Sequence, residues 1–407
     1  MKYRIRKILF AGSLLVLLAS PSVRSVETVF MGINVPLTGT FFREGEDELK
    51  AYKLAINIIN ERGGILGKKI VYSVKDTRSD AQEARKNAKE FIQNGAVLVT
   101  GGSSSAEAIA QSEECQKGGV IFMATLTHAN ETTWKNGHRH TFRWYNNAHQ
   151  SAKALAGELI RQHGQNARYA FLYANYSWGQ SVLESLKKAL EKSGGETILQ
   201  LPTELGAQSY ISQLLQVKKA EPDVLVLIEG GSDIMDCLKQ VAALELRKKM
   251  EIVIPLIDIR SAEFLGAEVL EGVMVSVPWD HSLAEMYDGS REFVELFQKE
   301  YRQKPGSAAA AAWVDILQYA DACERAKSFN HYQVIKALEG HHFQLLFDDE
   351  YWREWDHQGI HPTFVLQGKT PAEASDKWDL FKIIGVYKGE DIAETREENP
   401  VQLEPIP

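Results

Sequence analysis

Residues 29–35, "VFMGINV", open the stretch that decides the fold class. They predict a strand, and "KKIVYSVKD" at 68–76 predicts a second one. Between them, "EDELKAYKLAINIINERGG" at 46–64 predicts a helix, because its apolar residues recur at three- and four-residue spacing. The two glycines that end it suit a helix C-terminus. A strand, a helix and a strand in succession indicate a parallel βαβ unit.

The same alternation continues through most of the chain and starts again near residue 148. Further predicted strands include "AVLVTGG" (96–102), "VIFMAT" (120–125), "ARYAFLYA" (167–174), "DVLVLIEGG" (223–231) and "EIVIPLI" (251–257). Strands that are apolar almost throughout suit a parallel sheet covered on both faces. The sequence therefore predicts an α/β fold with two doubly wound parallel-sheet lobes. The last stretch, "ETREENPVQLEPIP", is acidic and contains proline, which predicts a loose tail.

The N-terminus has the pattern of a secretory signal peptide. Four basic residues lie among the first seven, and "ILFAGSLLVLLA" (8–19) is an apolar run too short to span a bilayer comfortably. Val23 and Ser25 suit cleavage before Val26. We expect residues 1–25 to be removed and the mature protein to be exported. Because no cysteine lies near the cut, we expect no lipid anchor.

Charge and cysteine content exclude several protein classes. The formal charge of −8 becomes −13 without the five positive charges of the signal, so we expect no nucleic acid or anionic membrane as a partner. Three widely spaced cysteines do not form a disulfide framework, and the sequence favours buried free thiols. A single disulfide between two of them is the alternative. The histidines lack metal-ligand spacing, so we expect neither metal nor cofactor.

In open parallel sheets, ligands bind outside the carboxyl ends of the strands. The loops that deserve inspection therefore follow residues 35, 100, 124, 174, 229 and 257. The loop "GGSSS" (101–105) precedes a helix, and its amides and hydroxyls suit either an anion or helix capping. It lacks the Lys-Ser/Thr pair of a phosphate-binding loop and the Gly-x-Ser-x-Gly pattern of a nucleophilic serine.

The other loops supply further candidate binding residues, and each of them could instead have a purely structural role. Thr125 and Thr127 offer hydroxyls and carbonyls, although turn formation alone would explain them. Trp178 suits an aromatic cover over a ligand or a packed helix start. Glu229 and Asp258 end two predicted strands, where each would meet an amine or remain solvated. Phe42, with Phe41, could line a cleft after the first strand, and Arg43 and Glu44 fit the rim.

Several phrases coincide with those of a known family. They are "GINVPLTGTF" (32–41), the long run 51–92, "GGSSS" (101–105), "YSWGQSVLESLKKALEKSGGE" (176–196) and "LEGVMVSVPW" (270–279). With them, nearly all of the mature chain resembles the type I periplasmic binding proteins, in the leucine/isoleucine/valine-binding branch that serves ABC importers. The resemblance implies two lobes joined by a hinge of three chain segments. Ligand is then held between the lobes and stabilises their closure.

The resemblance also implies the lobe boundaries. The first lobe is expected to hold residues 26–147 and about 281–345, and the second 148–280 and about 346–390. Residues 391–407 are then a C-terminal tail.

Residue by residue, the resemblance assigns ligand contacts. Ser104 matches the serine that binds the ligand carboxylate, and Thr125 the position whose carbonyl accepts the ammonium. Thr127 matches the threonine that contacts both groups, and Trp178 an aromatic residue of the second lobe. Asp258 matches the carboxylate that pairs with the ammonium, and Glu229 lies near another pocket position.

Two positions depart from the family pattern. Glu44 stands where an aromatic residue is usual, with Phe41 and Phe42 shifted, and Ala124 replaces a proline. The implied ligand is therefore an amino acid, an amide or a small aromatic acid. The implied role is that of a monomeric, non-enzymatic solute-binding protein of the periplasm that delivers its ligand to an ABC permease. A sensory protein for a membrane receptor is an alternative, and an exported α/β hydrolase is a further one.

Overall fold

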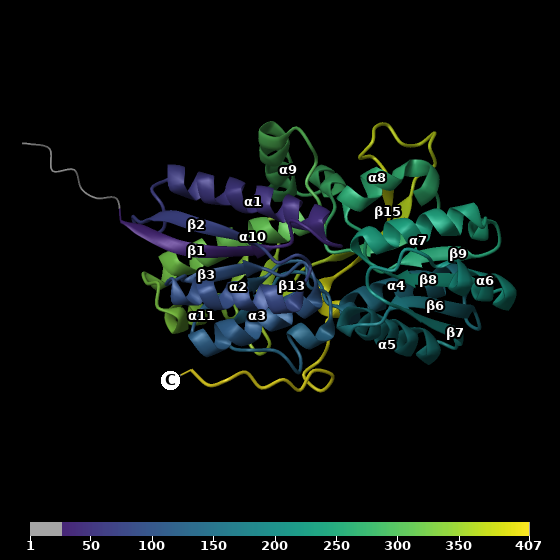
Figure 1. Cartoon of the computed structure of the whole chain (residues 1–407), viewed down its shortest axis with the longest axis horizontal. Helices are drawn as coiled ribbons and strands as arrows, with labels where there is room; N and C mark the ends of the chain where they lie inside the picture. The colour runs from purple at the N-terminus through teal and green to yellow at the C-terminus, as the bar shows by residue number, and fades with distance from the viewer. Residues whose placement is uncertain (1–26, 407) are drawn as a thin grey trace, which may run out of the picture.

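Two α/β lobes make up the part of the chain that the structure describes, residues 27–406 of a computed structural model (Figure 1). The strand orders of their sheets are β2-β1-β3-β4-β5 and β15-β14-β10-β9-β8-β6-β7. The predicted two-lobed α/β fold is thus confirmed. The expected signal peptide, residues 1–25, lies outside the described residues.

The first lobe has a sheet in which every pairing is parallel. Its strands are β1 (Thr28–Val35), β2 (Lys69–Asp76), β3 (Leu98–Gly101), β4 (Ile121–Ala124) and β5 (Thr141–Arg143). Successive side chains point to opposite faces, so Met31 packs in the same apolar cluster as α1 and α10, whereas Phe30 packs beside α2 and α3. The helices are α1 (Phe42–Glu61), α2 (Ala81–Gln93), α3 (Ser105–Gly118), α9 (Asp288–Tyr301), α10 (Ser307–Ala326) and α11 (His331–Leu338).

The second lobe also carries helices on both faces of its sheet. Its strands are β6 (Arg168–Ala174), β7 (Glu196–Thr203), β8 (Val224–Ile228), β9 (Glu251–Ile254), β10 (Met274–Val277), β14 (Thr363–Gly368) and β15 (Phe381–Tyr387). Its helices are α4 (Ala148–His163), α5 (Ser177–Lys192), α6 (Ile211–Ala220), α7 (Gly231–Ala243) and α8 (Ile259–Leu270). Within residues 27–406, no helix is long and apolar enough to cross a membrane.

The second sheet differs from the prediction at one edge. Strand β14 pairs antiparallel with both β10 and β15, so the sheet is mixed rather than wholly parallel. Parallel neighbours need a crossover connection, whereas β14 and β15 are joined without a helix, over residues 369–380. The apolar pattern of the chain does not distinguish these two directions.

The chain passes between the sheets in three places. It leaves β5 for α4, leaves β10 for α9, and returns to β14 through a small antiparallel sheet of β11 (His342–Phe343), β12 (Glu350–Trp352) and β13 (Gly359–Ile360). Near the first passage, a bridge pairs Arg143 with Gln358 of the third. The residues at which the lobes begin and end stay a prediction.

The C-terminal segment is packed against the first lobe, and the expectation of a loose tail is wrong. After α12 (Gly389–Ile392), Glu394 and Asn399 are buried. Glu404 accepts a hydrogen bond of 2.7 Å from the backbone N–H of Arg139. The segment therefore runs from the second lobe back along the first, as Figure 1 shows in yellow. Its acidic side chains have specific partners that composition alone does not reveal.

All three cysteines are buried and unpaired. Cys115 belongs to the core between α2, α3 and the first sheet, and Cys237 and Cys323 belong to the largest apolar cluster. This confirms the interpretation of buried thiols. Burial raises the pKa of Cys323 to about 12, which keeps the thiol protonated and unreactive near neutral pH.

Candidate functional site

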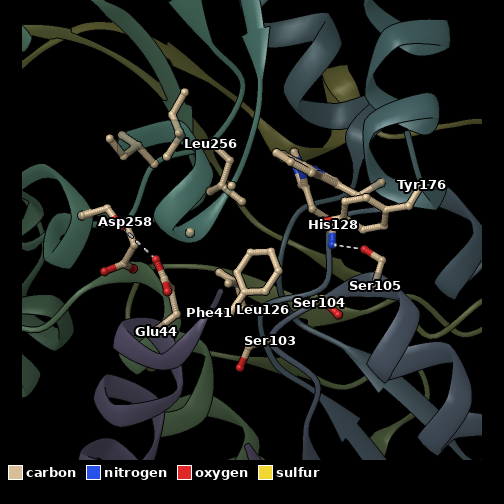
Figure 2. Close-up of a pocket in the computed structure, with 16 residues that line it drawn as sticks. Phe41, Glu44, Ser103, Ser104, Ser105, Leu126, His128, Tyr176, Leu256 and Asp258 are labelled. Carbon is tan, nitrogen blue, oxygen red and sulfur yellow. Dashed lines mark hydrogen bonds between the residues drawn. The ribbon is translucent and has the colours of Figure 1, made fainter. Parts of the chain in front are cut away.

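A pocket lies where the carboxyl ends of both sheets meet, and the space between its lining atoms, part of which is open to solvent, is about 440 Å³. All six loops singled out from the sequence contribute to it. The first lobe supplies Phe41, Glu44, Ser103, Ser104, Ser105, Leu126 and His128. The second supplies Tyr176, Trp178, Gly230, Gly231, Ile234, Leu256, Ile257, Asp258 and Ser261. Figure 2 shows Glu44 and Asp258 on one side, the serines and His128 on another, and Phe41 between them.

The three serines have different tasks at the start of α3. Ser104 is the N-cap, and its Oγ accepts a hydrogen bond of 3.3 Å from the backbone N–H of Glu107. Ser105 Oγ accepts from the backbone N–H groups of His128 and Ala129, at 3.2 and 3.0 Å. Ser103 donates to the carboxylate of Glu48 at 2.9 Å. The partial positive charge of the helix N-terminus thus faces the pocket, where it favours an anionic group.

His128 is a hydrogen-bonding residue at the edge of the pocket. The indole Nε1–H of Trp178 donates to its Nδ1 at 2.8 Å, so the imidazole proton lies on Nε2, 2.7 Å from Ser151 Oγ. Burial and then the charge of Arg143 lower the pKa of His128 to about 3. His128 is therefore neutral at physiological pH, and it orients the indole of Trp178.

The acidic side of the pocket contains Asp258 and Glu44. Asp258 is the N-cap of α8, and its Oδ2 accepts from Ser307 Oγ at 3.0 Å and from the Ala308 N–H at 3.1 Å. Glu44 Oε1 accepts from Ser261 Oγ at 3.0 Å. Burial and then repulsion by Asp258 raise the pKa of Glu44 to about 7. Two adjacent carboxyls at a buried position favour a ligand that donates hydrogen bonds or carries positive charge.

Hydrogen bonds join the two lobes across this pocket. They include Ser261 to Glu44, Ser307 to Asp258, Trp178 to His128 and the backbone N–H of Ser232 to the carbonyl of Thr40 at 3.1 Å. The structure is thus a closed arrangement in which both lobes contact the same enclosed space. Separating the lobes would break these bonds and expose the pocket.

The structure brings Ser104, Trp178 and Asp258 together at the pocket, but not the other candidates. Thr125 is fully buried behind it, where its Oγ1 donates to Asp315 at 3.0 Å, and its carbonyl accepts from the Thr127 N–H. Thr127 is also fully buried, and its Oγ1 lies 2.9 Å from that of Thr132. Neither threonine lines the pocket, so their contacts with ligand stay predictions.

Glu229 and Phe42 also lie outside the pocket lining. Glu229 is fully buried and accepts a hydrogen bond from Thr203, and burial raises its pKa to about 8. The two glycines that follow it line the pocket instead. Phe42 opens α1 and stacks against the Arg43 guanidinium, whereas its neighbour Phe41 is buried and lines the pocket.

Sequence reasoning missed much of the apolar lining. Leu126, Ile234 and Leu256 were not singled out, because one apolar residue in a loop or first helical turn looks the same whether it faces a core or a ligand. Ser261 was also missed. In the structure it lies one turn after Asp258 on α8 and faces the start of α1. In the sequence, its spacing of three residues from Asp258 was the only available signal.

A family model and a known binding protein both match this chain. A family model described as "Periplasmic binding protein" matches residues 28–375. The Leu/Ile/Val-binding protein homolog 1 of Brucella abortus (strain 2308) is 26% identical over 220 residues, 54% of this chain and 59% of that protein. The alignment thus spans less than two thirds of that relative.

Two solved structures have the same fold over nearly their whole length. A periplasmic binding protein from Burkholderia mallei has a TM-score of 0.85 at 22% identity, covering 92% of this chain and 98% of its own. An amino acid ABC transporter substrate-binding protein from Pseudomonas fluorescens Pf-5 has a TM-score of 0.82 at 28% identity, covering 89% and 96%.

Proposed function

This chain belongs to the periplasmic binding protein family, and from that premise we propose that it captures a small amino-acid-like or carboxylate-bearing solute and delivers it to an ABC importer. One observation carries the proposal: a single pocket is lined from both lobes, with the N-terminus of α3 on one side and two carboxyls on another. Such a pocket holds a solute only when the lobes are closed, so binding and closure are coupled.

The family is one of solute-binding proteins rather than enzymes, and its name places the chain outside the cytoplasm. We propose that residues 1–25 direct export and are removed, that the mature protein is a periplasmic monomer without a lipid anchor, and that its partner is the permease of an ABC importer. It needs no cofactor in this role.

A thermal-shift screen tests the proposal. A solute that binds only the folded protein stabilises it by RT ln(1 + L/Kd), where L is the free solute concentration, so the melting temperature rises with the logarithm of L above Kd. Amino acids, amides and small aromatic acids form the panel, and small-angle scattering of the best binder checks that the lobes close. A shift for one class with a smaller radius of gyration supports the proposal. A shift without any change in scattering contradicts the coupling of binding to closure.

Replacing Ser104 by alanine should weaken binding of the best solute of that screen about ten- to a hundredfold. The hydroxyl lies at the start of α3, where a charge-assisted hydrogen bond to a carboxylate is worth about 1.5–3 kcal/mol. Isothermal titration calorimetry measures the change. Asp80→Ala is the matched control, because Asp80 caps α2 in the same way and lies outside the pocket lining. Equal losses of affinity in both variants would show that capping alone matters.

Ligand binding should change the fluorescence of Trp178. Its indole lines the pocket and is 3% exposed, so a bound solute alters its surroundings without a change in fold. The chain has eight tryptophans, and the matched variant Trp178→Phe identifies the source of the signal. We expect that variant to lose most of the change in emission. A full change in Trp178→Phe would assign the signal to another tryptophan and to lobe movement.

A further inference from the structure

The charge of the pocket is one-sided. Among the lining residues, all of which the structure describes, Glu44 and Asp258 are acidic and none is lysine or arginine. His128 adds no charge, because its imidazole is neutral. A zwitterionic amino acid brings one ammonium to this pocket and places its carboxylate at the serines. One of the two buried carboxyls then remains without a cationic partner.

Glu44 has an oxygen atom that the protein leaves without a partner. Its side chain is buried and lines the pocket, and Oε1 accepts from Ser261. Its Oε2 has no hydrogen-bond partner among the residues that the structure describes. A buried oxygen of this kind costs free energy unless something satisfies it. In Figure 2 the carboxyl of Glu44 lies beside Asp258.

By contrast, the protein itself stabilises Asp258. Its carboxylate accepts hydrogen bonds from the N–H groups of Arg260 and Ala308 and from the hydroxyl of Ser307. These donors lie at the starts of α8 and α10, where helix dipoles also favour a negative charge. The protein therefore already supplies hydrogen-bond donors to the Asp258 carboxyl, which is suited to one ammonium. Glu44 is the carboxyl that needs a further partner.

The charged groups around Glu44 do not supply that partner. Asp258 faces it from the second lobe, and repulsion between the two raises the pKa of Glu44. On α1, Glu48 also repels Glu44. Arg43 has only a small lowering effect on the pKa of Glu44, and its guanidinium stacks on the rings of Phe42 and Phe264. From the hinge, the phenol of Tyr145 is uncharged, since burial and nearby carboxylates raise its pKa.

We infer that the solute is a basic amino acid, whose side-chain cation binds the free oxygen of Glu44 next to Asp258. The inference rests on the proposed function and names its substrate class. The carboxylate of the solute faces the N-terminus of α3, its α-ammonium meets Asp258, and its apolar stem passes Phe41, which Figure 2 shows between the two polar sides. Two cationic groups then balance two buried carboxylates.

Two pairs of amino acids of nearly equal shape test the inference by calorimetry on the mature protein. L-arginine is compared with L-citrulline, and L-lysine with L-norleucine, so that each pair differs mainly in the side-chain charge. We expect each cationic member to bind at least about tenfold more tightly, the gain of one charge-assisted hydrogen bond. Glu44→Gln should reduce that preference to about twofold or less. Equal affinities within both pairs would overturn the inference.

Glu46→Gln is the matched control, because Glu46 is exposed on the same helix and its replacement removes the same charge. It should leave both preferences unchanged. Loss of the preference in Glu46→Gln as well would show that overall charge selects the solute, and would overturn the role of Glu44. Melting curves of both variants show whether each is folded.

The pH dependence gives a second readout with a defined sign. In the closed arrangement without solute, the pKa of Glu44 is about 7, and a bound cation favours the ionised carboxylate. L-arginine should therefore bind more tightly as pH rises from 6 to 8, with release of a proton that calorimetry in two buffers detects. Glu44→Gln should lose this dependence. Tighter binding at pH 6 than at pH 8 would contradict the inference.

These outcomes separate the inference from the proposed function. If a neutral amino acid, an amide or an aromatic acid binds and L-arginine and L-lysine do not, the inference is wrong and the proposed function stands. If no compound of any class binds, both are wrong. If the basic amino acids bind and Glu44→Gln leaves the preference intact, another group provides the specificity and the role of Glu44 is wrong.

Discussion

Replacing Arg353 by methionine should lower the free energy of unfolding by about 3–5 kcal/mol, the cost of removing one partner from a buried ion pair. Arg353 is 8% exposed, and its guanidinium donates to both oxygens of Asp356, at 2.9 and 2.6 Å. It also lies 3.0 Å from the carboxylate of Glu394 and donates to its carbonyl at 2.9 Å. The variant leaves two buried carboxylates without their cation. Urea denaturation of the mature protein measures the loss.

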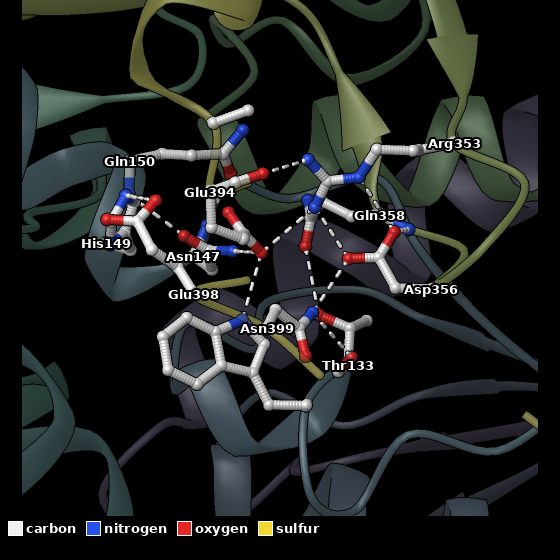
Figure 3. Close-up of polar contacts among 12 residues, drawn as sticks. Thr133, Asn147, His149, Gln150, Arg353, Asp356, Gln358, Glu394, Glu398 and Asn399 are labelled. Carbon is white, nitrogen blue, oxygen red and sulfur yellow. Dashed lines mark hydrogen bonds and ion pairs between the residues drawn. The ribbon is translucent and has the colours of Figure 1, made fainter. Parts of the chain in front are cut away.

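The position of this cluster explains why the effect should be large. Glu394 also accepts from Trp134 and Asn147, and Asn399 donates to Asp356 at 3.0 Å (Figure 3). One network therefore joins the C-terminal segment, the passage into α4 and the segment between β12 and β13. Loss of the Arg353 guanidinium should loosen all three together.

Arg396→Met is the matched control for this prediction. Arg396 is exposed, and its guanidinium lies over the same Trp355 ring as that of Arg353, at 4.8 and 4.1 Å. Its removal should cost less than about 1 kcal/mol, as for other exposed ion pairs and cation–π contacts. Similar losses in both variants would show that the ring contact, and not the buried ion pair, stabilises the cluster.

The pH dependence of the Arg353 variant has a definite sign. Burial already raises the pKa of Asp356, although Arg353 opposes that shift. Without the guanidinium, the folded state should hold protons on the buried carboxyls more tightly than the unfolded state does. Stability of the variant relative to wild type should then increase as pH falls from 7 to 5. A deficit that grows over this range would contradict the explanation.

Replacing Gly231 by alanine should weaken solute binding about ten- to a hundredfold, the second large effect that we expect. Gly231 lines the pocket from the second lobe with φ of 57°, and an added Cβ would lie 2.4 Å from the carbonyl oxygen of Thr40 in the first lobe. Contacts of this kind cost about 1–3 kcal/mol. The clash exists only when the lobes are closed, so it opposes the state that holds the solute.

Gly272→Ala separates this clash from backbone strain. Gly272 also belongs to the second lobe and has φ of 74°, but an added Cβ there meets no atom within 4 Å. Both variants should lose similar stability from the left-handed backbone, about 1–2 kcal/mol, and only Gly231→Ala should lose affinity. Calorimetry and small-angle scattering with ligand measure the difference. Full affinity and full compaction in Gly231→Ala would contradict the closed arrangement described above.

The fold could be predicted from the sequence because its signals are local and repeated. A buried parallel strand is apolar along its length, and a covering helix shows apolar residues on one face, so β1, α1 and β2 were recognisable from residues 29–76 alone. The pocket could be placed as well, because the carboxyl ends of parallel strands meet at one edge. Each of the six loops named from this rule lines it.

Individual side chains of the site were harder to predict. Phe41 and Phe42 are adjacent and chemically identical, yet only Phe41 faces the pocket, because α1 begins at Phe42 and turns the next side chain away. Leu126 and His128 line the pocket where Thr125 and Thr127 were expected, since alternate residues of an extended segment point to opposite sides. A family resemblance gives loop positions more securely than it gives side-chain directions.

Local chemistry in the sequence determined the two-lobed α/β architecture, the buried state of the cysteines and the sheet edge at which the pocket lies, because periodicity and strand polarity act over short distances. Only the tertiary structure decided the environment of each charge. Glu44 becomes a buried group with a free oxygen because Asp258 and Ser261, more than two hundred residues away, cover it. The acidic tail becomes ordered because Arg353 meets Glu394. Desolvation and ion pairing depend on which distant residues the fold brings together, and this cannot be read from the composition.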